Sequence, residues 1–332
     1  MNAVVDASEF RQIVEATRKS LQDNTEWIQR YAKYAEEISK NISQLSAAKK
    51  NIHEWDPLKF YITIGTAKSS YRKPEFQVRY LGQRVAAILF KNGPLLKTTK
   101  ELDVTNLRNF GCEISLPKVD WVSAEATKFR SFFRNREPIR VKYNNKGNDE
   151  HRVESMLLTE FSKEKSINKA LKYIKPVKIE KLRFSMLTPV KASDHKLEPF
   201  YSSQSGGGID IFTRVGNGRS SNLCIMELKD ENKRGEPPKL AIQQALIYAT
   251  FIRELLRSDS GQIWWKLFGY SKKIPSNLEL FAACVMPSNQ YDDKSFAGME
   301  IPIENDKITL HYLYFQEENN KITQIETSLN NK

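Results

Sequence analysis

Apolar side chains recur every three or four positions across residues 7–50, with charged residues between them. This period places the apolar positions on one face of a helix. The polar run Asp23-Asn24-Thr25 interrupts the pattern and favours two helices joined by a short turn over one long rod. The pattern therefore predicts a helical hairpin over residues 1–55 that packs on its own protein. A dimerising coiled coil is the alternative.

The next segment, residues 56–147, consists of short apolar runs broken by turns. Alternation over residues 76–80, followed by a Leu-Gly turn and another β-rich run, indicates a hairpin. This β-rich segment also concentrates the positive charge, since residues 57–150 hold 18 Lys and Arg against 9 Asp and Glu, in a chain of net charge +12. Release of counterions favours contacts between such side chains and phosphates. The expected strands are at 60–64, 76–80, 85–90 and 112–116.

Cations alternate with aromatic residues between positions 128 and 143. Such a surface can hold a nucleic-acid backbone and stack against bases. The alternative is an amphipathic helix whose phenylalanines face the core while its arginines face water. The sequence leaves both open, and the candidate nucleic-acid contacts are Lys128, Arg130, Arg134 and Arg136.

Residues 148–332 mix strands with helices, which predicts an α/β architecture. The three cysteines are scattered and show neither disulfide nor metal-site spacing. The longest apolar runs fall short of the ~18 residues that a membrane-spanning helix needs. A protein without membrane contacts, located in the cytoplasm, is therefore expected. The expected helices are at 153–165 and 241–257, and the expected strands are at 182–187, 209–215, 222–228, 278–285, 308–315 and 322–325.

One charged pair ends an apolar strand, because Glu227 and Lys229 follow the run Leu223 to Met226. Side chains alternate along a strand, so these two share a face. A turn near Gly218 would place Asp210 directly opposite Glu227 in a hairpin. Facing carboxylates repel unless a cation lies between them, and their hard oxygens suit Mg²⁺ or Mn²⁺.

A second copy of the Glu-x-Lys pattern, Glu231-Asn-Lys233, lies in a polar loop that ends in prolines. No strand is expected to present this copy. The first copy is distinguished by the glycine run and Asp210 before it and by Gln244 and Tyr248 after it. Residues four apart on a helix share a face, so Gln244 and Tyr248 would project together.

These motifs, Gly206-Gly-Gly-Ile-Asp210, Glu227-x-Lys229 and Gln244-x-x-x-Tyr248, resemble those of the PD-(D/E)XK nuclease superfamily. The resemblance covers about residues 150 to 290 and is closest to the RecB-like and lambda-exonuclease-like branch. Ile209 stands where the proline that names the superfamily would be. The residues before position 145 resemble no family in this way.

The resemblance implies a restriction-endonuclease-like core, in which helices flank a mixed central sheet, over residues 148–332. It also implies hydrolysis of phosphodiester bonds with Mg²⁺ or Mn²⁺. DNA is favoured as the substrate over RNA, but the sequence does not decide between them. The implied metal ligands are Asp210, Glu227, the Leu228 carbonyl and Glu154. Lys229 would orient the attacking water, while Gln244 and Tyr248 would contact nucleic acid or support the metal site.

Two other functions fit the same sequence. The chain could be an inert nucleic-acid-binding module that keeps the nuclease fold. It could also be a scaffold subunit whose N-terminal helices form a homodimer or join a partner subunit.

Overall fold

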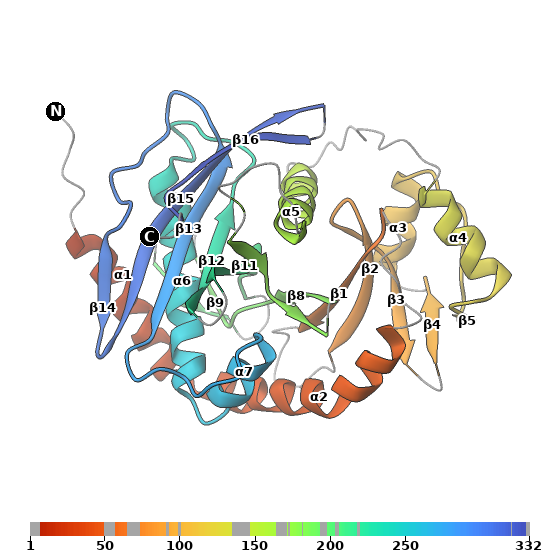
Figure 1. The fold of residues 1–332 in the computed structure, drawn as a ribbon, viewed down its shortest axis with the longest axis horizontal. Coiled ribbons are helices and arrows are strands. Elements are labelled where there is room, and N and C mark those ends of the chain that lie inside the picture. The colour runs from red at the N-terminus through yellow and green to blue at the C-terminus, as the bar shows by residue number, and fades with distance from the viewer. Residues whose placement is uncertain are drawn as a thin grey trace.

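Two seven-stranded sheets face each other across a central helix, α5 (Gly147–Ser162), in the computed structural model of this chain (Figure 1). Within the described residues both sheets mix parallel with antiparallel strands, which confirms the α/β class. None of the helices described is long and apolar enough to cross a membrane. The structure describes residues 7–49, 57–64, 74–90, 93–98, 101–134, 147–163, 171, 173–180, 182–192, 198–202, 206–217, 220–319 and 321–329.

The N-terminal segment forms two helices, α1 (Ala7–Gln22) and α2 (Glu26–Lys49), so the predicted break at residues 23–25 is confirmed. The two helices pack mainly on different parts of the core, α1 on helix α6 (Pro238–Arg257) and α2 on helix α7 (Gly261–Leu267). Tyr31 of α2 is fully buried, with its ring centroid 5.0 Å from that of Phe251 in α6. The apolar side chains described on both helices, which in α2 end at residue 42, are therefore covered by their own protein, as expected.

The first sheet combines strands from two distant parts of the chain. Its strand β8 (Leu182–Met186) runs parallel to β1 (Lys59–Ile64), so the predicted boundary at residue 147 does not separate the two sheets. Helices α3 (Glu101–Asn109) and α4 (Ala124–Arg134) lie at its far side (Figure 1). The remaining strands are β2 (Glu75–Tyr80), β3 (Gln83–Phe90), β4 (Pro94–Lys97), β5 (Val119–Asp120) and β7 (Lys178–Ile179).

The strand predicted at residues 112–116 is wrong, because this segment follows α3 as a loop. Cys112 and Leu116 are buried and anchor it to the core. Its backbone is tied at the two ends, where the Cys112 amide donates to Leu107 and the Leu116 carbonyl accepts from the Thr98 amide. Apolar anchors at both ends of a loop produce the same sequence pattern as a short strand.

The second sheet carries the candidate site. Its strands β11 (Ile211–Asn217) and β12 (Ser220–Leu228) form an antiparallel hairpin, and α6 and α7 connect β12 to the parallel strand β13 (Glu279–Pro287). Parallel neighbours need such a crossover. The other strands are β6 (Ile174–Pro176), β14 (Glu300–Ile303), β15 (Asp306–Glu318) and β16 (Lys321–Thr327), and a small separate pair consists of β9 (Val190–Lys191) and β10 (Phe200–Tyr201).

Opposite faces of the β11–β12 hairpin pack on different helices. Ile211 and Met226 belong to the apolar cluster around α5, whereas Phe212 and Ile225 belong to the cluster that contains α6. Because side chains alternate along a strand, Glu227 lies on the α6 face, at the end where β12 stops. The hairpin thus presents its last polar residues between the starts of two helices.

Candidate active site

Asp210 and Glu227 lie opposite each other at the open end of the β11–β12 hairpin. Ile211 pairs with Met226, so the next pair in this antiparallel register is Asp210 with Glu227. The Leu228 amide donates a hydrogen bond of 2.9 Å to Asp210 Oδ2. The predicted alignment of the two acids is therefore confirmed.

Lys229 holds one oxygen of Glu227 and leaves the other without a partner. Its Nζ lies 2.7 Å from Glu227 Oε1, and its amide donates to the Val285 carbonyl of β13 at 3.0 Å. Glu227 is only 5% exposed, and its Oε2 accepts no hydrogen bond from a fixed donor of the described residues, although the Asp210 carboxyl is close enough to share a proton with Glu227. A buried, unsatisfied carboxylate oxygen costs stability unless a cation or a proton reaches it.

Burial and mutual repulsion shift the ionisation of these groups. Burial and the charge of Glu227 raise the pKa of Asp210 well above its ordinary value. Burial also raises the pKa of Glu227, to about 7, although Lys229 acts in the opposite direction. Burial lowers the pKa of Lys229, but Glu227, Asp210 and Glu150 together outweigh this and the net shift is upward. Lys229 is thus a permanent cation, and it lies beside Asp210 and Glu227, which do not readily ionise at the same time.

Helix α5 adds two further acids. Burial and the charge of Asp210 raise the pKa of Glu150 to about 7. Glu154, one turn later, is 7% exposed, and its Oε2 lies 3.3 Å from Nδ1 of His151. Glu154 is one of the acids predicted from the sequence, whereas Glu150 is not. Their spacing of four residues puts both on one helix face and is the signal that could have identified Glu150.

The glycine-rich segment before Asp210 fixes the start of β11. The amide of Ile209 donates to the Met186 carbonyl of β8 at 3.0 Å. A proline at this position would lack that donor, so isoleucine suits the structure here. A Cβ on Gly207 would lie 2.3 Å from the Tyr248 hydroxyl, so only glycine permits this close approach. Asp210 is thereby tied to both sheets.

Gln244 and Tyr248 lie on α6 and are both buried, at 6% and 5% exposure. The Tyr248 ring packs against the backbone at Gly207. The structure therefore places this helix face beside the glycine-rich segment that precedes Asp210. Contact of either side chain with nucleic acid stays a prediction, as does a metal contact of the Leu228 carbonyl.

Arg130, the central residue of the basic and aromatic surface predicted on α4, is buried, so this part of the prediction is wrong. Arg130 is 5% exposed and donates to the Trp121 carbonyl and, at 3.1 Å, to Thr127 Oγ1. Its guanidinium carbon lies 4.5 Å from the centroid of the Trp121 ring. The helix is amphipathic, with Phe129 and Phe133 buried, so these rings are not exposed for base stacking. Lys128 and Arg134 are exposed, and Arg136 lies outside the described residues.

Replacing Arg130 by alanine is expected to lower the free energy of unfolding by about 2 kcal/mol, since buried hydrogen bonds of a charged group and its stacking on Trp121 are lost. Lys128→Ala, on the exposed face of the same helix, is the control and should change stability by less than about 0.5 kcal/mol. Urea denaturation measures both. Equal stability of the two variants would contradict this role of Arg130.

The donor set at the hairpin fits a hard divalent cation by its chemistry. Glu227 Oε2 is buried and unpaired, and the opposing Asp210 carboxylate raises the cost of a second negative charge. A cation that both acids bind would satisfy the oxygen and offset the repulsion. Among the described residues, no three His, Cys, Asp or Glu side chains are already grouped closely enough to hold a metal ion. The fit therefore rests on Asp210 and Glu227.

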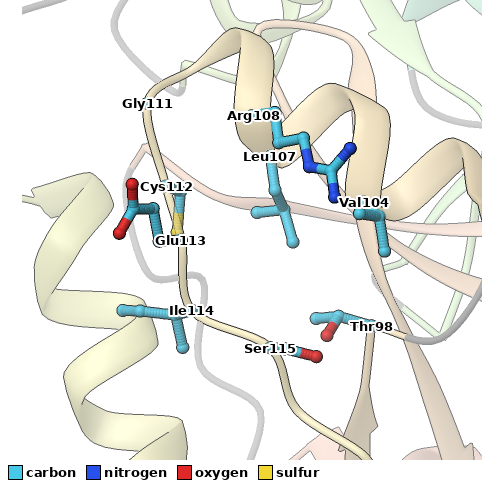
Figure 2. A pocket seen from close by; sticks show the side chains of 9 residues that line it. All are labelled: Thr98, Val104, Leu107, Arg108, Gly111, Cys112, Glu113, Ile114 and Ser115. Carbon is cyan, nitrogen blue, oxygen red and sulfur yellow. The ribbon is translucent and has the colours of Figure 1, made fainter.

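A cavity of about 620 Å³ lies away from this hairpin, between α3 and the loop at residues 111–115 (Figure 2). Its walls are largely apolar, with Arg108 and Glu113 among the lining residues. Asp210, Glu227 and Lys229 are not among the residues that line it. The reactive groups and the cavity are separate features.

Comparisons with models of known protein families, with curated proteins and with solved structures give no significant match to this chain. The assignment of function therefore depends on the residues and geometry described above.

Proposed function

We propose that this protein is a metal-dependent nuclease with a restriction-endonuclease-like core, which hydrolyses phosphodiester bonds in DNA. One observation carries the proposal. Asp210 and Glu227 oppose each other at the end of a hairpin, with an unpaired buried oxygen on Glu227 and the Lys229 ammonium 2.7 Å from its other oxygen.

The order of elements around the hairpin supports this core. Helix α5 precedes the β11–β12 hairpin, and α6 follows it and leads to the parallel strand β13. Helices α5 and α6 pack on opposite faces of the sheet, as the resemblance to the superfamily implies. The charged residues occupy the sheet end where β12 stops and the connection to α6 begins.

The residues at this end have distinct chemical roles. A divalent cation held by Asp210 and Glu227 would polarise a phosphate oxygen and lower the pKa of a bound water. Lys229 stays protonated and stabilises the negative charge that develops on the phosphate. Glu150 has a pKa of about 7, so it can accept and release a proton near neutral pH.

The direct test is cleavage by the purified chain with Mg²⁺, Mn²⁺ or EDTA. Linear duplex, circular duplex, single-stranded DNA and RNA should be compared side by side. We expect cleavage of DNA that requires the divalent ion and stops with EDTA. Binding without metal-dependent cleavage on any substrate would instead support the inert nucleic-acid-binding module. A stable complex with a partner subunit and no affinity for nucleic acid would support the scaffold.

A further inference from the structure

Two arginines of the first sheet flank the same tyrosine on the face that points to α5. Tyr61 of β1 pairs with Arg183 of β8 and belongs to the apolar cluster around α5. The guanidinium carbon of Arg79 lies 4.2 Å from the Tyr61 ring centroid, and that of Arg183 lies 5.7 Å away. Positive charge is thus concentrated on the inner face of this sheet.

Within the described part of the chain, neither guanidinium forms an ion pair with a carboxylate. Arg183 is 3% exposed and donates to the Tyr61 hydroxyl at 3.2 Å and to Thr159 Oγ1 at 3.0 Å, while its Nε has no partner. Among the described residues, Arg79 donates to the neutral oxygens of Gln77, at 3.0 and 3.1 Å, and of Thr63, at 3.5 Å.

Two other buried arginines of the same protein are neutralised by carboxylates. Arg84 pairs with Asp103 at 2.6 Å, and Arg253 pairs with Asp306 at 2.7 Å. An unpaired cation that is removed from water carries a large desolvation cost. No carboxylate of the described residues neutralises Arg79 or Arg183, in contrast to Arg84 and Arg253.

The strand β2, which carries Arg79, ends beside α5. A Cβ on Gly82, in the β2–β3 turn, would lie 2.2 Å from the carbonyl oxygen of His151, so the turn abuts the first part of α5. The hydrogen bond to Glu154 raises the pKa of His151, and the charges of both Arg79 and Asp210 also act on it. Since His151 Nδ1 lies 3.3 Å from Glu154 Oε2, the turn that ends β2 adjoins the acidic part of α5.

We infer that Arg79 binds a backbone phosphate of the nucleic acid, beside the phosphate that Asp210 and Glu227 act on, and that Arg183 positions the Tyr61 ring on which Arg79 stacks. The identity of the ligand rests on the proposed function. Arg79 is partly exposed and can reach a ligand, whereas the buried Arg183 supports it from inside the sheet. The basic segment at residues 57–150 would then contact the substrate through β2 and not through α4.

The test measures binding and not cleavage. A fluorescent duplex oligonucleotide is titrated in EDTA with Asp210→Asn protein, with and without Arg79→Gln, at several KCl concentrations. The logarithm of the association constant falls as the logarithm of the salt concentration rises. Loss of one phosphate contact is expected to make this slope less negative by about 0.9. Affinity at about 0.1 M salt should fall on the order of tenfold. Arg79→Lys keeps the charge and should keep the slope.

Lys266→Ala is the matched control, because it removes one exposed charge from α7. Helix α7 precedes β13 and so lies at the opposite end of the sheet from Glu227. This variant should leave the slope unchanged. Thermal unfolding of each variant checks the fold, and Arg79→Ala provides a second neutral replacement should the glutamine variant unfold.

A slope and an affinity equal to those of the parent in the folded neutral variant would overturn the inference. The anion at Arg79 could also be free phosphate. Competition of inorganic phosphate with the oligonucleotide, at constant ionic strength, tests this alternative. Displacement by free phosphate that depends on Arg79, with oligonucleotide binding that does not, would also overturn it. Because no cleavage is measured, Arg79-dependent binding by a chain that never cuts DNA would reject only the proposed nuclease.

Discussion

Replacing Glu227 by glutamine is expected to reduce metal-dependent DNA cleavage on the order of 10³-fold, with the fold preserved. Glutamine keeps the shape of the side chain but removes the charge that a divalent cation requires. The stabilisation that a bound metal gives the transition state amounts to several kcal/mol, and each 1.4 kcal/mol corresponds to a factor of ten in rate. Asp210→Asn should have an effect of similar size, and initial rates at saturating metal measure both.

The chain contains its own control for this experiment. Glu231 and Lys233 repeat the Glu-x-Lys pattern and form an ion pair, but their side chains are 42% and 51% exposed. Glu231→Gln and Lys233→Ala should therefore cleave at the rate of the unmodified protein. Equal cleavage by all four variants would point to a contaminating nuclease and would reject the assignment of the active site.

The site residues that the sequence located correctly are those fixed by local rules. Alternation along a strand puts Glu227 and Lys229 on one side, and hairpin register brings Asp210 opposite Glu227. Both rules involve residues fewer than about 20 positions apart, and neither depends on where the rest of the chain packs. The exposed Glu231-Asn-Lys233 copy could be set aside on the same grounds.

The features that the sequence missed depend on contacts between distant segments. The pKa of Glu150 is raised by its burial and by the charge of Asp210, both of which depend on how α5 packs in the fold. The pairing of β1 with β8 joins residues more than a hundred positions apart, and no local pattern encodes it. Arg130 alternates with aromatics as a nucleic-acid contact would, yet Trp121 covers it.

Without metal, the free energy of unfolding is expected to fall as pH rises from about 5 to about 8. Glu150 and Glu227 have a pKa of about 7 in the folded protein, against an ordinary value of 4.5. Between these values the folded state holds protons that the unfolded state has released, so stability declines with rising pH. Each pKa unit corresponds to about 1.4 kcal/mol, so the loss amounts to a few kcal/mol.

Manganese should oppose this loss of stability at high pH. Metal binding competes with protons for the same oxygens, so the rise in melting temperature that Mn²⁺ causes should be larger at pH 8 than at pH 6. Asp210→Asn removes one acid of the repelling pair, and it should stabilise the metal-free protein at pH 8 and abolish the effect of Mn²⁺. Glu231→Gln should retain both responses. An equal Mn²⁺ shift in the Asp210→Asn variant would show that Asp210 does not bind the metal and would place the metal elsewhere.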